Sequence, residues 1–251
     1  MNNRRFVQVV VGGTAAALVV AAGATVVLDP FFHYHNPLEG VEYPLEDGME
    51  RYLNDGIIKR YDYDAAIVGT SMMQNFKASQ FDSLFGTKSI KVTYTAETYY
   101  AIDQEARKVL RENPDTKYIF RCLDYNKIFQ AGEVRNYDEY PDYLYDDNIL
   151  NDVNYVLNKE IFLDSTLPVI RYNMLGKETT SMDDYSFWEW AHPVGKEHVM
   201  EGYQRTEDEA NEQKAFSEED RQTVIDNVTE NVIRTVEENP DTTFIFYTPP
   251  Y

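Results

Sequence analysis

The chain has little cysteine, little histidine and a shortage of basic side chains: one Cys, four His, and 23 Lys and Arg against 43 Asp and Glu in 251 residues. The single Cys122 excludes an intrachain disulfide framework and any cysteine-based metal cluster. It lies in the apolar stretch 118–123, so we expect a buried, unreactive thiol. The formal net charge of −20 argues against a nucleic-acid partner, because phosphate backbones are bound by clustered Lys and Arg.

One long run, residues 7–28, carries no charge. Its 22 residues exceed the roughly 20 that cross a bilayer as a helix. Arg4 and Arg5 precede the run and Asp29 follows it, so the positive-inside rule places the N-terminus in the cytoplasm and the bulk outside. The alternative is a cleaved signal peptide, because Ala22-Gly23-Ala24 has the spacing of a cleavage site. The length of the run favours an uncleaved, single-pass anchor.

The remaining chain is long enough to bury a substantial core in one domain.

Glycines at 12, 13 and 23 form a small-residue face in the apolar run, which suits packing against a membrane-protein partner. We therefore predict four parts: a cytoplasmic tail 1–6, a transmembrane helix 7–28, a juxtamembrane segment 29–48 and an α/β domain 49–251.

The juxtamembrane segment is aromatic and punctuated by proline between residues 31 and 44. His33 and His35 are two positions apart and would share a face of an extended chain, but the segment offers no further metal ligands. We expect these rings to lie in the aromatic belt at the membrane interface.

Apolar strands alternate with helical patterns through much of the soluble part, which predicts a parallel sheet with both faces covered. The nine residues from Glu112 recur from Glu238, and each copy links a helix to a strand. We expect strands at 65–68, 89–93, 117–123 and 243–247; a helix at 50–61 interrupted at Gly56; a short helix or turn within 72–85; and helices beginning at Thr98 and Ser217.

The last of these helices has two further signals. Ser217 with Asp220 three residues on resembles a capping box. Valines and isoleucines between 224 and 236 form one apolar stripe, which we expect to pack into the core.

Residues 124–216 are the least regular part of the sequence. Tyrosine and aspartate are dense at 136–155, and acids are dense at 201–220, so we expect solvated loops. Two alternatives remain: aspartates that bind calcium, although the EF-hand pattern is absent, and tyrosines that stack on sugar rings.

Ser71 is the main candidate for chemistry, because Gly69-Thr70-Ser71 follows a predicted buried strand. Such a position lies on the rim of an α/β sheet, where nucleophiles are held. A serine hydroxyl also needs a base, usually histidine. The structural alternative is that Thr70 or Ser71 caps the helix that follows.

The pattern Glu50-Arg51-Tyr52, Asn54-Asp55-Gly56-Ile57, Asp62-Tyr63-Asp64, Gly69-Thr70-Ser71-Met72 and Asn75-Phe76 resembles the SGNH/GDSL hydrolase superfamily. It is similar to a membrane-anchored branch from bacterial envelope-polysaccharide loci, itself distantly similar to the D-alanyl transfer proteins of teichoic acid synthesis. The resemblance covers residues 29–123 and, more loosely, the last helix and strand. It implies a three-layer, flavodoxin-like parallel sheet behind one transmembrane helix.

The resemblance also implies site residues. Ser71 is the expected nucleophile, the backbone amide of Ala96 and the side chain of Asn126 are expected oxyanion donors, and no metal or organic cofactor is implied. Threonine replaces the middle aspartate of the family's Gly-Asp-Ser, and the family's Asp-x-x-His is missing after the last strand. Glu189-x-x-His192 has a related spacing but precedes the final helix, and His198 is a weaker candidate. The expectation is a catalytic histidine beyond residue 251, in a chain incomplete at its C-terminus.

The function implied is an esterase or acyltransferase at the bacterial cell membrane, acting outside it on acylated envelope glycans. The contrasting hypothesis is a binding or scaffold protein on the same frame, which the departures from the family motifs favour. A calcium-dependent lectin built on the Asp and Tyr loops is a third possibility. The sequence does not identify the acyl group or the oligomeric state.

Overall fold

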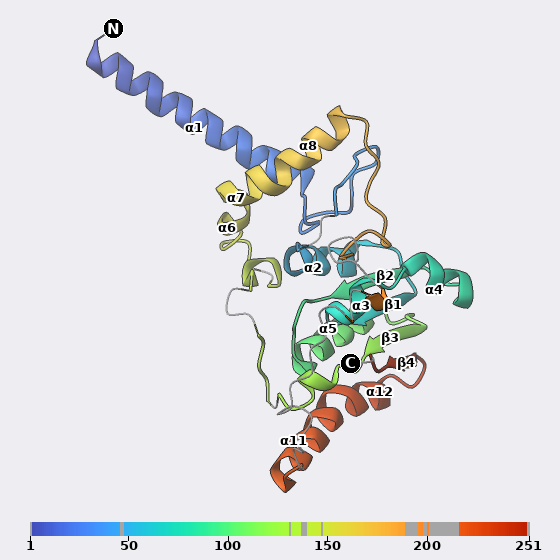
Figure 1. The fold of residues 1–251 in the computed structure, drawn as a ribbon. Coiled ribbons are helices and arrows are strands. Elements are labelled where there is room, and N and C mark those ends of the chain that lie inside the picture. Colours follow the sequence, from blue (N-terminus) through green and yellow to red (C-terminus); the bar gives the residue numbers. More distant parts are fainter. Residues whose placement is uncertain are drawn as a thin grey trace. The chain divides into compact units, whose positions relative to one another are not determined.

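The computed structural model describes residues 2–45, 48–130, 132–136, 140–146, 148–188, 195–197, 200 and 216–249. Contacts divide the chain into two compact units, so the predicted range 49–251 falls partly in each (Figure 1). Unit 1 comprises Met1–Tyr61 and Glu139–Ser181, and unit 2 comprises Asp62–Asp138 and Met182–Tyr251.

Unit 1 is helical in the part that the structure describes. Its helices are α1 (Asn3–Leu28), α2 (Glu50–Arg60), η2 (Asp142–Leu144), α6 (Val153–Val156), α7 (Lys159–Ile161), the π-turn η3 (Phe162–Thr166) and α8 (Leu167–Met174). Helix α1 is long and apolar enough to cross a membrane, as the charge-free run predicts.

A buried carboxylate ends α1. Asp29 has left-handed backbone with φ 42°, and its side chain accepts hydrogen bonds from the amides of His33, Tyr34 and His35 and from the Tyr155 hydroxyl. Four donors compensate the desolvation of the charge.

The aromatic juxtamembrane segment corrects a sequence expectation. Phe31 and Phe32 are 3% and 0% exposed. Phe31 stacks on Tyr52 and Tyr155, and Phe32 makes edge-to-face contacts with other rings of unit 1. They form a core and not an interfacial belt. Unit 1 lacks a sheet among its described residues, and these rings share its core with aliphatic side chains such as Leu53 and Ile57.

Helix α2 runs through Gly56 without the expected interruption. The glycine has a packing reason, because a Cβ there would lie 2.0 Å from the carbonyl oxygen of Phe31. Only glycine permits this approach between helix and backbone.

The helices between residues 153 and 174 also differ from expectation. The sequence predicts solvated loop at 136–155, which α6 overlaps, and only irregular structure in the residues that follow. Asn158 caps α7 by accepting from the amides of Glu160 and Ile161. Frequent Asn, Asp and Tyr obscured the pattern, and the π-turn adds a residue that breaks the 3.6-residue period.

Unit 2 contains a four-stranded sheet, entirely parallel, in the order β2-β1-β3-β4. It confirms the predicted α/β class. Its elements are β1 (Ala65–Gly69), α3 (Ser71–Gln74), α4 (Ala78–Phe85), β2 (Ser89–Thr93), α5 (Tyr99–Glu112), β3 (Tyr118–Cys122), η1 (Tyr125–Lys127), α11 (Glu218–Val228), the π-turn η5 (Thr229–Ile233), α12 (Arg234–Glu238) and β4 (Thr243–Tyr247).

Helices cover both faces of this sheet. Ile67 of β1 lies in a cluster with Met73 of α3 and Phe81 of α4. The other face carries Arg121 of β3, fully buried, whose guanidinium binds Asp103 of α5 at 3.0 Å. Alternation along the strands produces these two layers.

The helix α11–α12 has the predicted capping box between Ser217 and Asp220, but it buries an unexpected face. Asn227, Asn231 and Thr235 are buried, whereas Ile225 and Ile233 are 46% and 43% exposed. The expected packing of the whole apolar stripe is therefore wrong. The π-turn η5 shifts the helical phase, and partners such as the carbonyl of Ile128 and the carboxylate of Asp103 satisfy the polar groups.

Candidate functional site

The candidate site lies at the carboxyl edge of the sheet, where the strand order reverses. From β1 the chain passes to β2 on one side, and then returns across to β3 on the other. Loops after β1 and β3 therefore diverge at this point, which is where open α/β sheets bind ligands. The loop after β1 carries Ser71, and the loop after β3 carries Asp124 and Asn126.

Ser71 is the first residue of α3 and is partly exposed. Thr70 is the N-cap, since its side chain accepts from the Met72 amide, so the capping role belongs to Thr70. Within the described residues the Ser71 hydroxyl has no hydrogen-bond partner. Gly69 makes the turn possible, because a Cβ there would lie 2.6 Å from Cγ of Met73.

Asp124 connects the two loops of the switch point. Its carboxylate accepts a 3.1 Å hydrogen bond from Thr70 Oγ1 and another of 3.1 Å from the amide of Asn126. Asp124 is only 7% exposed, so these bonds are shielded from water. The Asn126 residue is exposed, and its role as an oxyanion donor stays a prediction.

The loop after β2 holds Ala96 in a left-handed conformation with φ 58°. Its carbonyl accepts from Asn136 Nδ2, while the buried Glu97 carboxylate accepts from the amides of Thr98 and Asn136. Left-handed backbone costs alanine about 1 kcal/mol, which these contacts offset. They make the loop a rigid support; the oxyanion role of its Ala96 amide stays a prediction.

Residues 182–188 form a strap across this edge that sequence reasoning missed. Trp188 donates from Nε1 to the carbonyl of Ser71 at 3.0 Å and from its amide to Asn75 Oδ1 at 3.1 Å. Ser186 bonds Thr93 through their hydroxyls at 2.9 Å. The strap thus holds α3 at its first residue, Ser71, and at Asn75, the residue after its end. No local pattern marks it, because its partners lie about a hundred residues earlier in the chain.

The strap also fixes α4. Asp183 accepts from the amide and hydroxyl of Ser79 at 2.8 and 2.5 Å, and Lys91 donates from Nζ to the Asp183 carbonyl. Burial acts to raise the pKa of Asp183, but the Ser79 hydrogen bonds and the nearby Lys91 charge lower it overall. The carboxylate therefore stays ionised at neutral pH, and its negative charge interacts favourably with the positive end of the α4 helix dipole.

Cys122, two residues before Asp124, is buried as the sequence predicts. The thiol is buried and free, and burial followed by the Asp124 charge raises its pKa to about 12. A protonated thiol is neither a nucleophile nor a metal ligand.

Comparisons with family models, curated proteins and solved structures find no match for this chain. The site's own geometry must therefore carry any functional argument.

The described part of unit 2 contains no histidine that could act as a base toward Ser71. His192 and His198, and with them the Glu189-x-x-His192 spacing, lie outside the described residues. His33 and His35 belong to unit 1, where His33 Nε2 lies 3.3 Å from Asp152. Among the residues described, no group of three or more His, Cys, Asp or Glu is placed to hold a metal ion.

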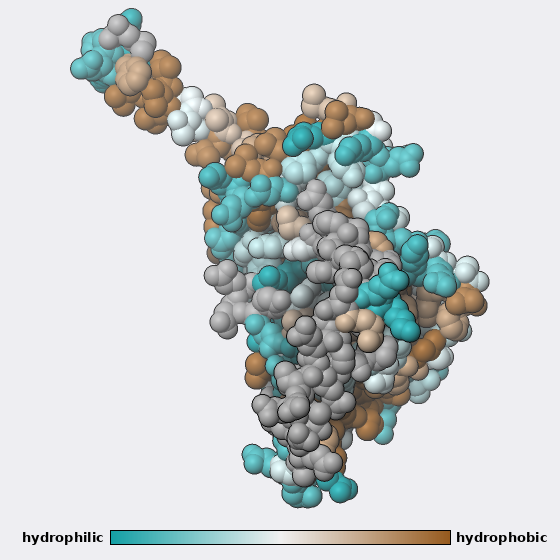
Figure 2. Space-filling view, viewed as in Figure 1, coloured by the Kyte–Doolittle hydropathy of each residue, from teal (hydrophilic) through white to brown (hydrophobic). Residues whose placement is uncertain are grey.

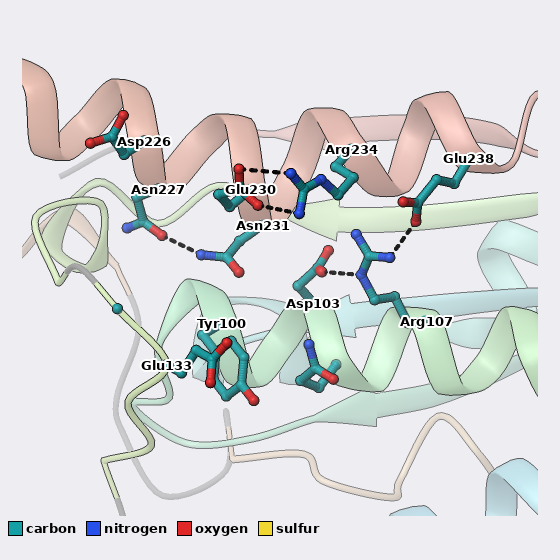
Figure 3. A pocket seen from close by; sticks show the side chains of 12 residues that line it. Tyr100, Asp103, Arg107, Glu133, Asp226, Asn227, Glu230, Asn231, Arg234 and Glu238 are labelled. Atoms are coloured by element: carbon teal, nitrogen blue, oxygen red, sulfur yellow. Dashed lines mark hydrogen bonds and ion pairs between the residues drawn. The ribbon is translucent and has the colours of Figure 1, made fainter.

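A separate polar groove of about 660 Å³ lies between α5 and α11–α12 (Figure 3). Its two arginines are paired within it. Arg107 binds Asp103 at 2.6 Å and also Glu238, and Arg234 binds Glu230 at 3.0 Å. Each of these two cations is therefore already paired with a carboxylate of the groove.

Proposed function

We propose that the chain is a membrane-anchored SGNH-type serine esterase or acyltransferase, acting outside the cell membrane on acylated envelope polysaccharide. One observation carries the proposal. Ser71 stands at the carboxyl end of β1 beside the strand-order reversal, with its hydroxyl unpartnered among the described residues. A four-stranded parallel sheet with two helical layers is compatible with the flavodoxin-like frame of that superfamily.

In the proposed reaction Ser71 Oγ attacks the ester carbonyl of an acylated sugar. The tetrahedral intermediate forms, with its oxyanion facing backbone amides near Ser71 and Ala96, and collapses as the sugar hydroxyl leaves. Water or a second hydroxyl then takes the acyl group from Ser71. A histidine outside the described residues moves the proton in both steps. Hydrolysis and transfer share the acyl-serine and differ in the second nucleophile.

Helix α1 supplies the proposed anchor, and Arg4 and Arg5 favour a cytoplasmic N-terminus with the rest of the chain outside. The substrate class follows from the family resemblance and from this location.

A fluorophosphonate probe on the full chain tests the enzyme, because it modifies only activated serines. In a protein that includes the catalytic histidine, we expect labelling of the parent and of Ser83→Ala, which removes an exposed hydroxyl on α4, and none of Ser71→Ala. Labelling that persists in Ser71→Ala contradicts the proposal.

The second candidate is a non-catalytic protein that binds envelope polysaccharide on the same frame. It is favoured by the absence of histidine from the described part of unit 2 and by Asp124, whose carboxylate is engaged by Thr70 and Asn126. It predicts no probe labelling, together with retention of acylated polysaccharide by both the parent chain and Ser71→Ala.

A further inference from the structure

A second apolar element lies beside the C-terminal end of α1. The hydroxyls of Thr25 in α1 and Thr166 in the π-turn η3 form a 3.0 Å hydrogen bond, and both residues are buried. Helix α6 also contacts α1, and Figure 1 shows α8 continuing from this junction. All belong to unit 1. The segment 149–175, called here the collar, therefore has a defined position at the end of α1.

The collar buries one side and leaves apolar side chains on the other. Ile161 and Val169 are 5% and 1% exposed and pack inward. Leu150 and Met174, in contrast, are 87% and 80% exposed. Figure 2 shows hydrophobic surface along α1 and continuing at the elements beside its end. The large apolar residues exposed in the collar are Ile149, Leu150, Val153, Leu157, Leu163, Met174 and Leu175.

Spacing within the collar is that of an amphipathic helix. Leu163, Leu167, Ile170 and Met174 follow one another at intervals of four, three and four residues, and all are at least partly exposed. A globular core does not need such residues outside. Contiguous exposed apolar surface marks an interaction site.

The collar is close to neutral, whereas the chain as a whole is strongly acidic. It contains three acidic residues and two basic ones, with Lys177 two positions after it, in a protein of net charge −20. Lys177 lies over the Tyr172 ring, 5.0 Å from its centroid. Near-neutral charge avoids repulsion from anionic headgroups, and a Tyr–Lys pair suits the interface between lipid and water.

We infer that the collar lies in the surface of the bilayer that α1 enters, with its outer apolar side chains among the lipid headgroups and upper acyl chains. A helix leaving a membrane brings the elements packed on its end to the interface, and amphipathic helices there bury their apolar face in lipid. The inference rests on the proposed membrane anchor. The occupant of the patch is lipid, and not a second copy or a soluble protein.

Nitroxide labels on the full chain in phosphatidylethanolamine–phosphatidylglycerol vesicles test this. Single cysteines replace Leu150 or Met174 in a Cys122→Ala background, and collisions with oxygen and with a water-soluble nickel chelate are compared. Val19→Cys in α1 is the lipid reference, and Ser83→Cys, exposed on α4, is the aqueous reference. Each variant must retain the parent's melting temperature, which excludes misfolding as the cause of a signal.

We expect oxygen-to-nickel collision ratios at 150 and 174 several-fold above that of Ser83→Cys. Ratios equal to the aqueous reference overturn the inference, as do labels shielded from both reagents, which indicate a protein partner or a second copy. If the label at Val19→Cys gives the same collision ratio as the aqueous reference, the proposed anchor is wrong, and so is the inference about the collar. A lipid-type ratio at position 19 together with aqueous ratios at 150 and 174 supports the membrane anchor and contradicts only the inference about the collar.

Discussion

The indole of Trp188 donates a 3.0 Å hydrogen bond to the carbonyl oxygen of Ser71. The Trp188 amide binds Asn75, so a single residue of the strap holds the first turn of α3 and the residue after its end. The candidate nucleophile is thus positioned through its backbone, while its hydroxyl has no hydrogen-bond partner among the described residues.

Trp188→Phe removes the indole donor and keeps most of the ring. We expect a loss of about 1 kcal/mol in the free energy of unfolding and a several-fold slower fluorophosphonate reaction at Ser71. Urea denaturation and timed labelling measure the two effects. Tyr100→Phe, which removes a hydroxyl on α5, should change neither. A labelling rate unchanged in Trp188→Phe contradicts a positioning role.

Asp124→Asn weakens the link between the loops after β1 and β3. The variant keeps one acceptor oxygen but replaces the other with an amino group facing Thr70 or the Asn126 amide, so we expect a loss of about 1–2 kcal/mol in stability. The double variant with Thr70→Val should lose less free energy of unfolding than the two single variants added together, since both changes remove the Thr70–Asp124 hydrogen bond. Additive losses in urea denaturation indicate that the bond is not formed in solution.

Asp183→Asn tests the strap's cap on α4. Asp183 has a lowered pKa in the folded chain, so its contribution is present above the unfolded pKa and disappears as pH falls through the folded one. At pH 7 we expect Asp183→Asn to lose about 1 kcal/mol. The difference in free energy of unfolding between the parent and Asp183→Asn should become smaller below about pH 4, near the unfolded pKa, as Asp183 takes up its proton. Thermal unfolding between pH 7 and pH 3 provides the measurement, and a constant difference contradicts the capping role.

Lys108 also makes stability rise with pH, but in an alkaline range and because a penalty is removed there. Burial, followed by the neighbouring Arg111, lowers the pKa of this α5 lysine to about 8, and its residue is 8% exposed. The unfolded chain holds this proton more tightly, so folding is penalised below pH 8 and the penalty is removed between pH 8 and 10.5. We expect Lys108→Met to stabilise the protein at pH 7 by on the order of 1 kcal/mol. Melting temperatures of both chains should converge as pH rises from 8 to 10.

The Cys122 thiol offers a simple check of the packing below the site. With its pKa raised to about 12 by burial, it should react with a disulfide reagent at pH 8 at least about 100-fold more slowly in the folded chain than in urea. Absorbance of the released thiolate follows the reaction. Rapid reaction of the folded chain contradicts the close packing of Cys122 against Gly69.

The parallel sheet was predictable because each strand is short, rich in apolar or β-branched residues and bounded by polar or glycine residues. Predicted strands 89–93 and 243–247 agree with the observed bounds, and the helix predicted from Thr98 begins immediately after it. Local hydrophobic pattern carries this information, since a buried strand needs apolar side chains on both faces.

The contacts that organise the site were not predictable in the same way. Asp124 meets Thr70 from 54 residues away, and Trp188 meets Ser71 from 117 residues away. No spacing rule expresses such pairs. The buried face of α11–α12 was missed for a second reason. Asn227 and Thr235 are satisfied there by partners that only the fold brings near, and Asn231 binds Asn227 within the helix. The π-turn also shifts the phase of the stripe.

Asp29 has a mechanical consequence. Three successive amides and the Tyr155 hydroxyl converge on its carboxylate one residue after α1 ends. The connection has no loose residues at which a hinge or swivel could form. Helix α1 should therefore tilt and rotate together with the rest of unit 1, so that a torque on the helix is transmitted to the aromatic core of that unit.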